Sequence, residues 1–326
     1  MPYALLGMTH ADAWSAHTAT MSAQLPMSFF QAIVIGLMQG VTELFPVSSL
    51  GHSVLIPNWI GGSWASLVGN ESTAESPYLA FIVVLHVATA LALLLFFWRE
   101  WIAIIHGLFR SIARRKIETV HERMAWLLVI STIPAGITGL LLEHTLRTIF
   151  AKPLAAAIFL TVNSFILFGG EKLRVRAYAA GGREASHDGG DASGEELDAA
   201  VVERVRPGDA AWIGLAQVGA LFAGVSRSGI TMVAGLARGL DHEQAVRFTF
   251  LLATPIIFAA GVLKIPDFTG TLGEGIRLQA LAGAGAAFVG ALFATTFLTR
   301  YFRSNKLTPF AIYCFLFGVA SIIRFA

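Results

Sequence analysis

Long apolar segments dominate the chain, and each is about as long as a helix must be to cross a bilayer. A hydrocarbon core of about 30 Å takes about 20 helical residues to cross. We therefore expect an all-α polytopic membrane protein, a bundle whose spanning helices lie at about residues 78–98, 124–143, 153–170, 246–263, 278–299 and 307–325.

Two further apolar regions, residues 29–60 and 211–240, are interrupted near the middle by Pro, Gly and Ser. The first contains GVTELFPVSSLGH (40–52) and the second contains AGVSRSGIT (223–231). Non-helical backbone at membrane depth is tolerated only where it is buried in protein or lines a wet cavity. We interpret both regions as broken helix hairpins, either re-entrant or spanning.

The two broken regions also resemble each other at a constant offset of 178 residues. IGLMQGVTELFPVSSLG (35–51) aligns with IGLAQVGALFAGVSRSG (213–229), and the shared positions include Gly-Leu-x-Gln and Val-Ser-x-x-Gly. We infer a duplication, with repeat one at about 28–170 and repeat two at about 210–326. Repeats of opposite orientation place a site near the bilayer midplane, between broken helices.

Loop charge gives the expected orientation. Six basic residues between 99 and 123 predict a cytoplasmic loop: Arg99, Arg110, Arg114, Arg115, Lys116 and Arg123. Residues 61–77 contain no Lys or Arg and are expected outside. The first hairpin then opens from outside and the second from inside, so the repeats would be inverted.

Composition agrees with a membrane protein and excludes other classes. Only 13% of the residues are charged, against about 25% in soluble domains. The net charge of +2 and the lack of a basic tract argue against nucleic acid as a partner. Cys314 is the single cysteine, so no disulfide framework exists.

A single transmembrane domain is expected at residues 28–326, and two segments are expected to take no part in its helices. Residues 1–27 contain no Lys or Arg and form a flexible leader in our interpretation. Residues 179–206 are rich in Gly, Ala and acidic residues, and predict a disordered cytoplasmic loop without a catalytic role.

Glu43 is the first candidate for chemistry, because an ionisable residue inside a membrane is a functional hypothesis by default. Gln39 lies one turn earlier on the same helical face. Their oxygens could bind a divalent cation. The alternatives are a carboxylate at a helix end near the interface and a Gln that bonds the broken backbone.

The second hairpin offers a phosphate cradle. Arg227 is flanked by Ser226 and Ser228, with Thr231 one turn further on. A guanidinium, hydroxyls and free N–H groups at a helix start suit a phosphate. The alternatives are a structural ion pair for the arginine and hydroxyls that satisfy only the broken backbone.

His52 follows the serines of the first hairpin and could act as a general acid or base. A lone histidine is more often structural, but the nearby carboxylate favours function here. His86 lies within a long apolar segment, and we expect it to be a packed, hydrogen-bonded residue.

These motifs resemble those of the bacterial undecaprenyl-diphosphate phosphatases, the bacitracin-resistance family. QGVTELFPVSSLGH is similar to that family's (E/Q)xxxE–PVSSxGH signature, and AGVSRSGIT to its PGxSRSxxT motif. The resemblance implies an inner-membrane enzyme of two inverted repeats with a site open to the periplasm. It implies hydrolysis of the terminal phosphate of undecaprenyl diphosphate for peptidoglycan synthesis. Bacitracin would compete by sequestering the same lipid.

Positions matched to the family's motifs give the expected roles. Glu43 and Gln39 would hold Mg²⁺ or Ca²⁺, and Glu43, Ser49, His52 and Arg227 would be catalytic. Ser48, Ser226, Ser228 and Thr231 would bind substrate. The nucleophile stays open between Ser49, His52 and water.

The chain departs from the family pattern at a few positions. Gln39 carries one charge less than the alternative Glu, Ala223 replaces a usual Pro, and Cys314 stands where Arg is common. A homodimer is compatible with the sequence.

Two rival functions differ in their needs. A lipid-phosphate transporter of inverted repeats would need the arginine and hydroxyls, but neither nucleophile nor metal. The other membrane lipid-phosphatase superfamily needs a His about six residues after the Ser-Arg pair. His242 is the first histidine after Arg227, so that superfamily is excluded.

Overall fold

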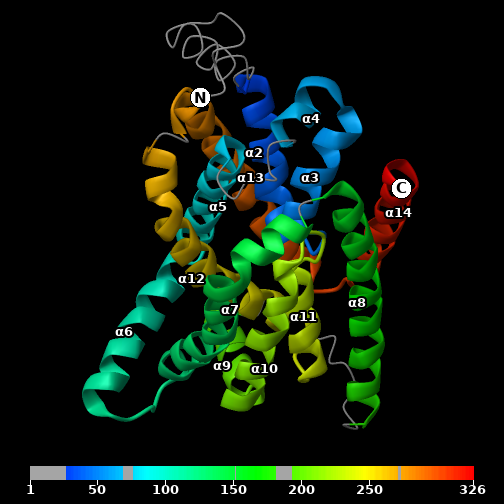
Figure 1. The fold of residues 1–326 in the computed structure, drawn as a ribbon. Helices are drawn as coiled ribbons and strands as arrows, with labels where there is room; N and C mark the ends of the chain where they lie inside the picture. Colours follow the sequence, from blue (N-terminus) through cyan, green and yellow to red (C-terminus); the bar gives the residue numbers. More distant parts are fainter. Residues whose placement is uncertain (1–26, 69–75, 151, 181–192, 271–272) are drawn as a thin grey trace, which may run out of the picture.

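The structure is a computed structural model that describes residues 27–68, 76–150, 152–180, 193–270 and 273–326, and the described elements are helical (Figure 1). Six helices are long and apolar enough to cross a membrane, which confirms the six predicted spans. They are α5 (Pro77–Phe96), α7 (Val120–Phe150), α8 (Pro153–Ala180), α12 (His242–Thr269), α13 (Arg277–Tyr301) and α14 (Thr308–Phe325).

Both predicted hairpins are broken, the first around Pro46 and Ser48 and the second around Gly224 and Ser226. The first consists of α2 (Phe29–Leu44) and α3 (Ser49–Ile60). The second consists of α10 (Pro207–Ala216), the 3₁₀ helix η1 (Gln217–Leu221) and α11 (Arg227–Ala237).

The helices that follow the two breaks begin with the same cap. Ser48 Oγ accepts a hydrogen bond from the Gly51 N–H at 3.2 Å, and Ser226 Oγ accepts one from the Gly229 N–H at 3.1 Å. These residues coincide at the 178-residue offset. The shared cap supports the inferred duplication, whereas the inverted orientation of the repeats stays a prediction.

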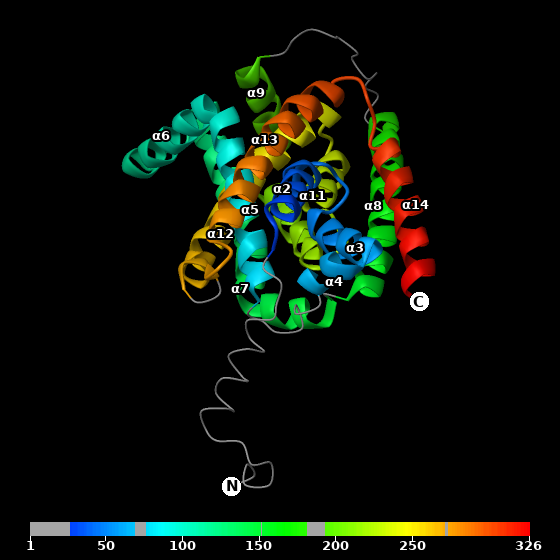
Figure 2. The ribbon, with the colours of Figure 1, turned by 90° about the horizontal axis from the view of Figure 1, so that it is seen from above.

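The broken helices occupy the middle of the bundle. Seen from above, α2, α3 and α11 lie between α5, α12 and α13 on one side and α8 and α14 on the other (Figure 2). Glycines bring α2 against α13: a Cβ at Gly36 or Gly40 would collide with the backbone carbonyl of Gly283 or Ala287, respectively. Small residues at such contacts let membrane helices approach closely.

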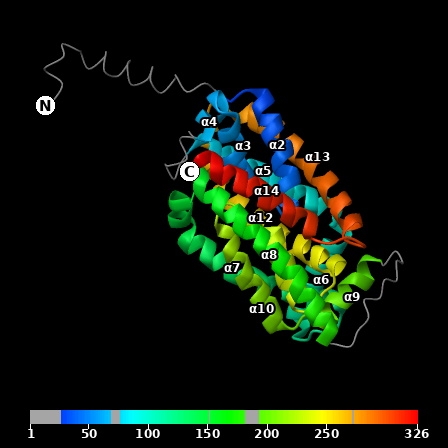
Figure 3. The same cartoon turned by 90° about the vertical axis from the view of Figure 1, so that its right-hand side faces the viewer.

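Shorter helices cover the two ends of the bundle. The helix α4 (Gly62–Val68) lies at one end, and α6 (Trp98–Arg114) and α9 (Gly194–Arg204) lie at the other (Figure 3). The segment containing α6 was predicted only as a basic loop. Residues 61–77 and 99–123, which the charge pattern assigns to opposite sides, thus contribute helices at opposite ends.

The prediction of a disordered loop over 179–206 is wrong for the part that the structure describes. Ser193 and Glu196 form a reciprocal capping box at the start of α9. On α9, Asp198 is fully buried and accepts from Arg247 of α12 at 2.6 Å (Nε to Oδ1) and 3.1 Å (Nη2 to Oδ2). Residues 181–192 and most of the predicted leader lie outside the described residues.

Replacing Asp198 with alanine should lower the free energy of unfolding by about 3–5 kcal/mol, because it leaves a buried guanidinium with one carboxylate fewer. Among the described carboxylates, Arg247 would then keep its contact with Glu100 of α6, at 3.4 Å. Thermal unfolding of the purified protein in detergent measures the loss. Glu195→Ala, at an exposed position of the same helix, is the matched control. Equal stability of the two variants would contradict the structural role of α9.

Candidate active site

Glu43, near the end of α2, is the residue on which the two hairpins converge. Its carboxylate is buried, and Oε2 accepts from Gln39 Nε2 at 3.0 Å and from Ser49 Oγ. His86 Nε2 of α5 lies 3.2 Å from the same oxygen. Arg227 Nη1 of α11 lies 3.9 Å from Oε1. The structure therefore brings the predicted carboxylate, hydroxyl and guanidinium together across two distant stretches of sequence.

His86 belongs to this site, although the sequence suggested only a packed residue. Its Nδ1 lies 2.8 Å from the Ile82 carbonyl, which can only accept, so Nδ1 carries a hydrogen. Nε2 and the carboxylate oxygen would both be acceptors without a further hydrogen between them. A second proton is therefore bound either to His86 Nε2 or to Glu43 Oε2. The sequence does not indicate the partner of His86, because that partner is set by the packing of α5 against α2.

Three of the helices offer pairs of polar side chains one turn apart, which share a helical face. The pairs are Gln39 with Glu43, Ser49 with Ser53, and Arg227 with Thr231. Each pair includes a buried atom that has no hydrogen-bond partner among the described residues: Gln39 Oε1, Ser53 Oγ, Arg227 Nη1 and Thr231 Oγ1. Buried polar groups are ordinarily paired, so this concentration of unpaired groups indicates a site prepared for a polar ligand.

Three of the predicted substrate-binding serines are engaged by the broken backbone. Ser48 and Ser226 cap the helices that follow the breaks. Ser228 Oγ donates to the Phe45 carbonyl at 3.0 Å and lies 3.0 Å from Ser226 Oγ. These bonds favour the alternative in which the hydroxyls bond the free backbone groups at the breaks. They also join one hairpin to the other.

Thr231 and Ser226 should therefore respond differently to substitution. Thr231→Val removes a hydroxyl that has no hydrogen-bond partner among the described residues, so stability should hold. KM should rise about 10-fold to 150-fold, since a hydrogen bond to a charged group contributes about 1.5–3 kcal/mol. Ser226→Ala removes a cap and should cost about 1 kcal/mol of stability. Thermal unfolding and KM of both variants check this. A destabilised Thr231→Val protein with an unchanged KM would contradict the assignment.

His52 of α3 is buried, and its hydrogen bonds go to neither Glu43 nor Arg227. Its Nδ1 lies 2.7 Å from the Ser48 carbonyl, and its Nε2 lies 2.7 Å from Tyr313 Oη of α14. The two rings also stack, with centroids 5.7 Å apart. A carbonyl only accepts, so Nδ1 donates, and in the neutral ring Nε2 accepts from the tyrosine hydroxyl. Both nitrogens are thus occupied.

The oxygens around Glu43 supply only some of the ligands that a divalent cation needs. Among the described residues no group of three His, Cys, Asp or Glu side chains could form a metal cage. Glu43 Oε1 accepts no hydrogen bond there, and Gln39 Oε1 is buried without a partner. Mg²⁺ is often bound by one or two carboxylates together with phosphate oxygens and water. The residues therefore fit a cation whose coordination is completed by oxygens of the bound ligand.

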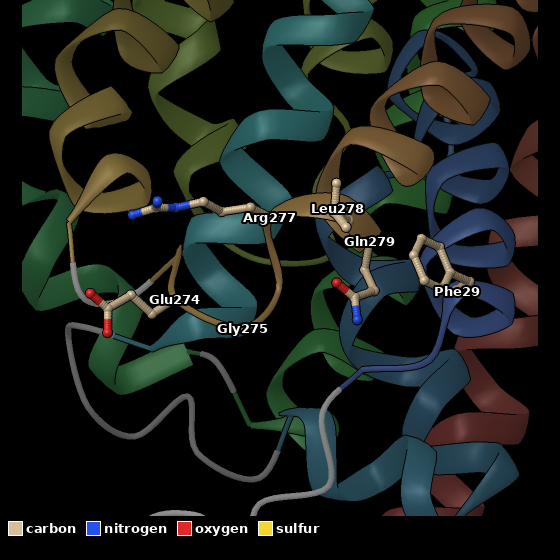
Figure 4. Close-up of a pocket in the computed structure, with 6 residues that line it drawn as sticks. All are labelled: Phe29, Glu274, Gly275, Arg277, Leu278 and Gln279. Atoms are coloured by element: carbon tan, nitrogen blue, oxygen red, sulfur yellow. The ribbon is translucent and has the colours of Figure 1, made fainter.

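A separate shallow pocket lies at the start of α2 and α13 (Figure 4), lined by Phe29, Glu274, Gly275, Arg277, Leu278 and Gln279. Phe29 is fourteen residues before Glu43 on α2, or about 21 Å at about 1.5 Å per residue. In Figure 4 the Arg277 side chain extends away from Phe29. This pocket brings no convergent charged groups together, so it does not compete with the Glu43 site.

Comparison with known proteins adds independent findings. Residues 32–320 match the family described as "Bacitracin resistance protein BacA". The chain is 54% identical over 306 residues to the "Undecaprenyl-diphosphatase" of Mycobacterium avium (strain 104), covering 94% of this chain and 99% of that protein. It is 50% identical over 338 residues to "Undecaprenyl-diphosphatase 2" of Frankia alni, covering 92% of this chain and 98% of that protein.

Proposed function

Because the chain belongs to the bacitracin resistance protein BacA family, we propose that it is an undecaprenyl-diphosphatase. As a phosphoanhydride hydrolase, it converts undecaprenyl diphosphate into undecaprenyl phosphate and inorganic phosphate. The product is the lipid carrier of peptidoglycan synthesis. Bacitracin, which sequesters the same lipid diphosphate, competes with the enzyme, and hydrolysis confers resistance.

The observation that best supports this function within the molecule is the set of unpartnered polar groups on the helices that meet at Glu43. Arg227 Nη1 and Thr231 Oγ1 are donors in a buried setting, where a charge-assisted bond to phosphate is about twice as strong as a neutral one. The Glu43 carboxylate, which accepts from the Ser49 hydroxyl, lies 3.9 Å from Arg227 Nη1. A carrier that only moves lipid would have no use for that pair of carboxylate and hydroxyl.

Ser49 is the nucleophile that the geometry favours. Its hydroxyl already donates to Glu43 Oε2, so the carboxylate can take the proton as Oγ bonds to the terminal phosphorus. The bond from phosphorus to the bridging oxygen breaks, and undecaprenyl phosphate leaves. Water then attacks the phosphorus of the phosphoserine, and Glu43 returns its proton to Oγ as the bond from phosphorus to Oγ breaks. This step releases inorganic phosphate and restores both the hydroxyl and the carboxylate. His52 supports α3 through Ser48 and Tyr313 in this scheme.

Charge on the phosphoryl oxygens is stabilised by Arg227, whose guanidinium faces the site from α11. His86 and Gln39 hold Oε2 of Glu43. A Mg²⁺ or Ca²⁺ ion, held by Glu43 and Gln39, would neutralise part of the diphosphate charge when bound.

We place the enzyme in the bacterial inner membrane with the site open to the periplasm. The support is the separation of the basic α6 from α4 at opposite ends of the bundle, together with the positive-inside rule. The groups named above all come from one chain, so a homodimer is compatible with the function but is not required for it.

Phosphate release from undecaprenyl diphosphate by detergent-purified protein tests this function. Steady release over many turnovers is expected, and EDTA should slow it if the cation is required. Lipid movement across proteoliposomes without any phosphate release would instead establish the transporter. If EDTA leaves the rate of phosphate release unchanged, the cation requirement is wrong, but the hydrolase function still holds.

A further inference from the structure

Asn163 connects the two broken hairpins from a helix that belongs to neither. It lies on α8 and is fully buried. Its Nδ2 donates to the Pro46 carbonyl at 3.0 Å, in the break between α2 and α3. Its Oδ1 accepts from the Ser226 N–H at 3.0 Å, at the cap of α11.

Both backbone groups need a partner, because each falls where a helix is interrupted. An unsatisfied N–H or C=O inside a membrane costs several kcal/mol. A primary amide carries a donor and an acceptor on one short side chain, so Asn163 satisfies both at once. A carboxylate would lack the donor, and an aliphatic side chain would lack both.

Other polar residues of α8 do not share this arrangement. Thr161 Oγ1 donates to the Ala157 carbonyl at 2.9 Å, and Ser164 Oγ donates to the Thr161 carbonyl at 2.6 Å. Those bonds stay within the helix. Asn163 is the α8 residue whose side chain bonds both breaks among the described residues.

The two bonds lie next to the reacting groups. Pro46 is three residues after Glu43, and Ser226 directly precedes Arg227. We propose that Asn163 is a positioning residue that fixes the register between the carboxylate of the first hairpin and the guanidinium of the second. Its catalytic consequence depends on the proposed hydrolase function.

The test combines kinetics with a distance measurement that needs no activity. Nitroxide labels at Ile60→Cys and Ala237→Cys sit at the ends of α3 and α11, both at exposed positions. Asn163→Leu removes both bonds at similar volume, and Asn163→Ala does so without a clash. Ser164→Ala is the matched control.

Both Asn163 variants should broaden the label–label distance distribution and lower kcat about 10-fold to 100-fold, as expected for misplaced catalytic groups, while KM changes little. Ser164→Ala should leave both readouts as in the parent. An unchanged distance distribution overturns the proposal, as does a broadened one with parental kcat. If the parent protein releases no phosphate, the hydrolase function fails, and the distance distribution alone decides whether Asn163 sets the register.

Discussion

Replacing Arg227 with alanine should lower kcat/KM for phosphate release by about 10²–10³-fold, the usual effect of removing one preorganised donor to developing negative charge. Arg227 Nη1 is buried without a hydrogen-bond partner in the described protein, and its approach to Glu43 is loose at 3.9 Å. The guanidinium is therefore available to a phosphate. Steady-state kinetics with the purified variant measures the effect.

Arg238 is the matched control, since it directly follows α11 but pairs with Asp209 at 3.3 Å and lies over the ring of Trp212. Arg238→Ala should change stability more than catalysis. If the Arg227→Ala enzyme had the parental kcat/KM, the guanidinium would have no role in the mechanism.

Replacing Glu43 with glutamine should reduce kcat by about 10²–10⁴-fold, the range for loss of a general base. The substitution keeps the size of the side chain but removes the charge that accepts the Ser49 proton. It also places an amide next to the two nitrogens that face Glu43 Oε2, which are Gln39 Nε2 at 3.0 Å and His86 Nε2 at 3.2 Å. The variant's kcat, compared with its thermal unfolding, separates lost chemistry from lost folding.

Glu122 provides the comparison for a buried carboxylate outside the site. Its Oε2 accepts from the backbone N–H groups of Glu118 and Thr119 at 2.6 and 3.0 Å. Glu122→Gln should cost stability and leave kcat near the parental value. If Glu43→Gln lost no more activity than this control, Glu43 would have no part in the chemistry.

The spanning helices and both breaks could be predicted from the sequence, because the physical signals are local. A run of about 20 apolar residues has few alternatives to a membrane helix. Pro46, Gly224 and the serines interrupt the helical pattern within a few residues. Gly224 adopts a φ of 110°, which suits a residue without a side chain.

The end helices were missed for different reasons. Composition suggested disorder over 179–206, yet Ser193 and Glu196 have the spacing of a capping box, and that local signal marks the start of α9. Burial of Asp198 against Arg247 could not be foreseen, since it depends on a contact between α9 and α12. The segment of α6 combines basic residues with exposed apolar side chains such as Ile102 and Phe109, so its charge alone does not distinguish a loop from a helix.

Within the site, the motifs identified the residues but not their partners. Glu43, Ser49 and Arg227 meet as expected, whereas His52 is turned toward Tyr313. His86 and Asn163 lie in apolar spans outside the two hairpin motifs. Their roles follow from the way α5 and α8 pack beside the hairpins, which single-sequence periodicity does not encode.

A double-mutant cycle on kcat/KM, with Glu43→Gln, Arg227→Ala and the combined variant, tests most directly whether the two hairpins form one site. Residues that act as a unit in catalysis show strongly non-additive losses. The account predicts that the combined variant is little worse than the more damaged single variant. Losses that simply multiply would contradict it, because they would mean that Glu43 and Arg227 act independently.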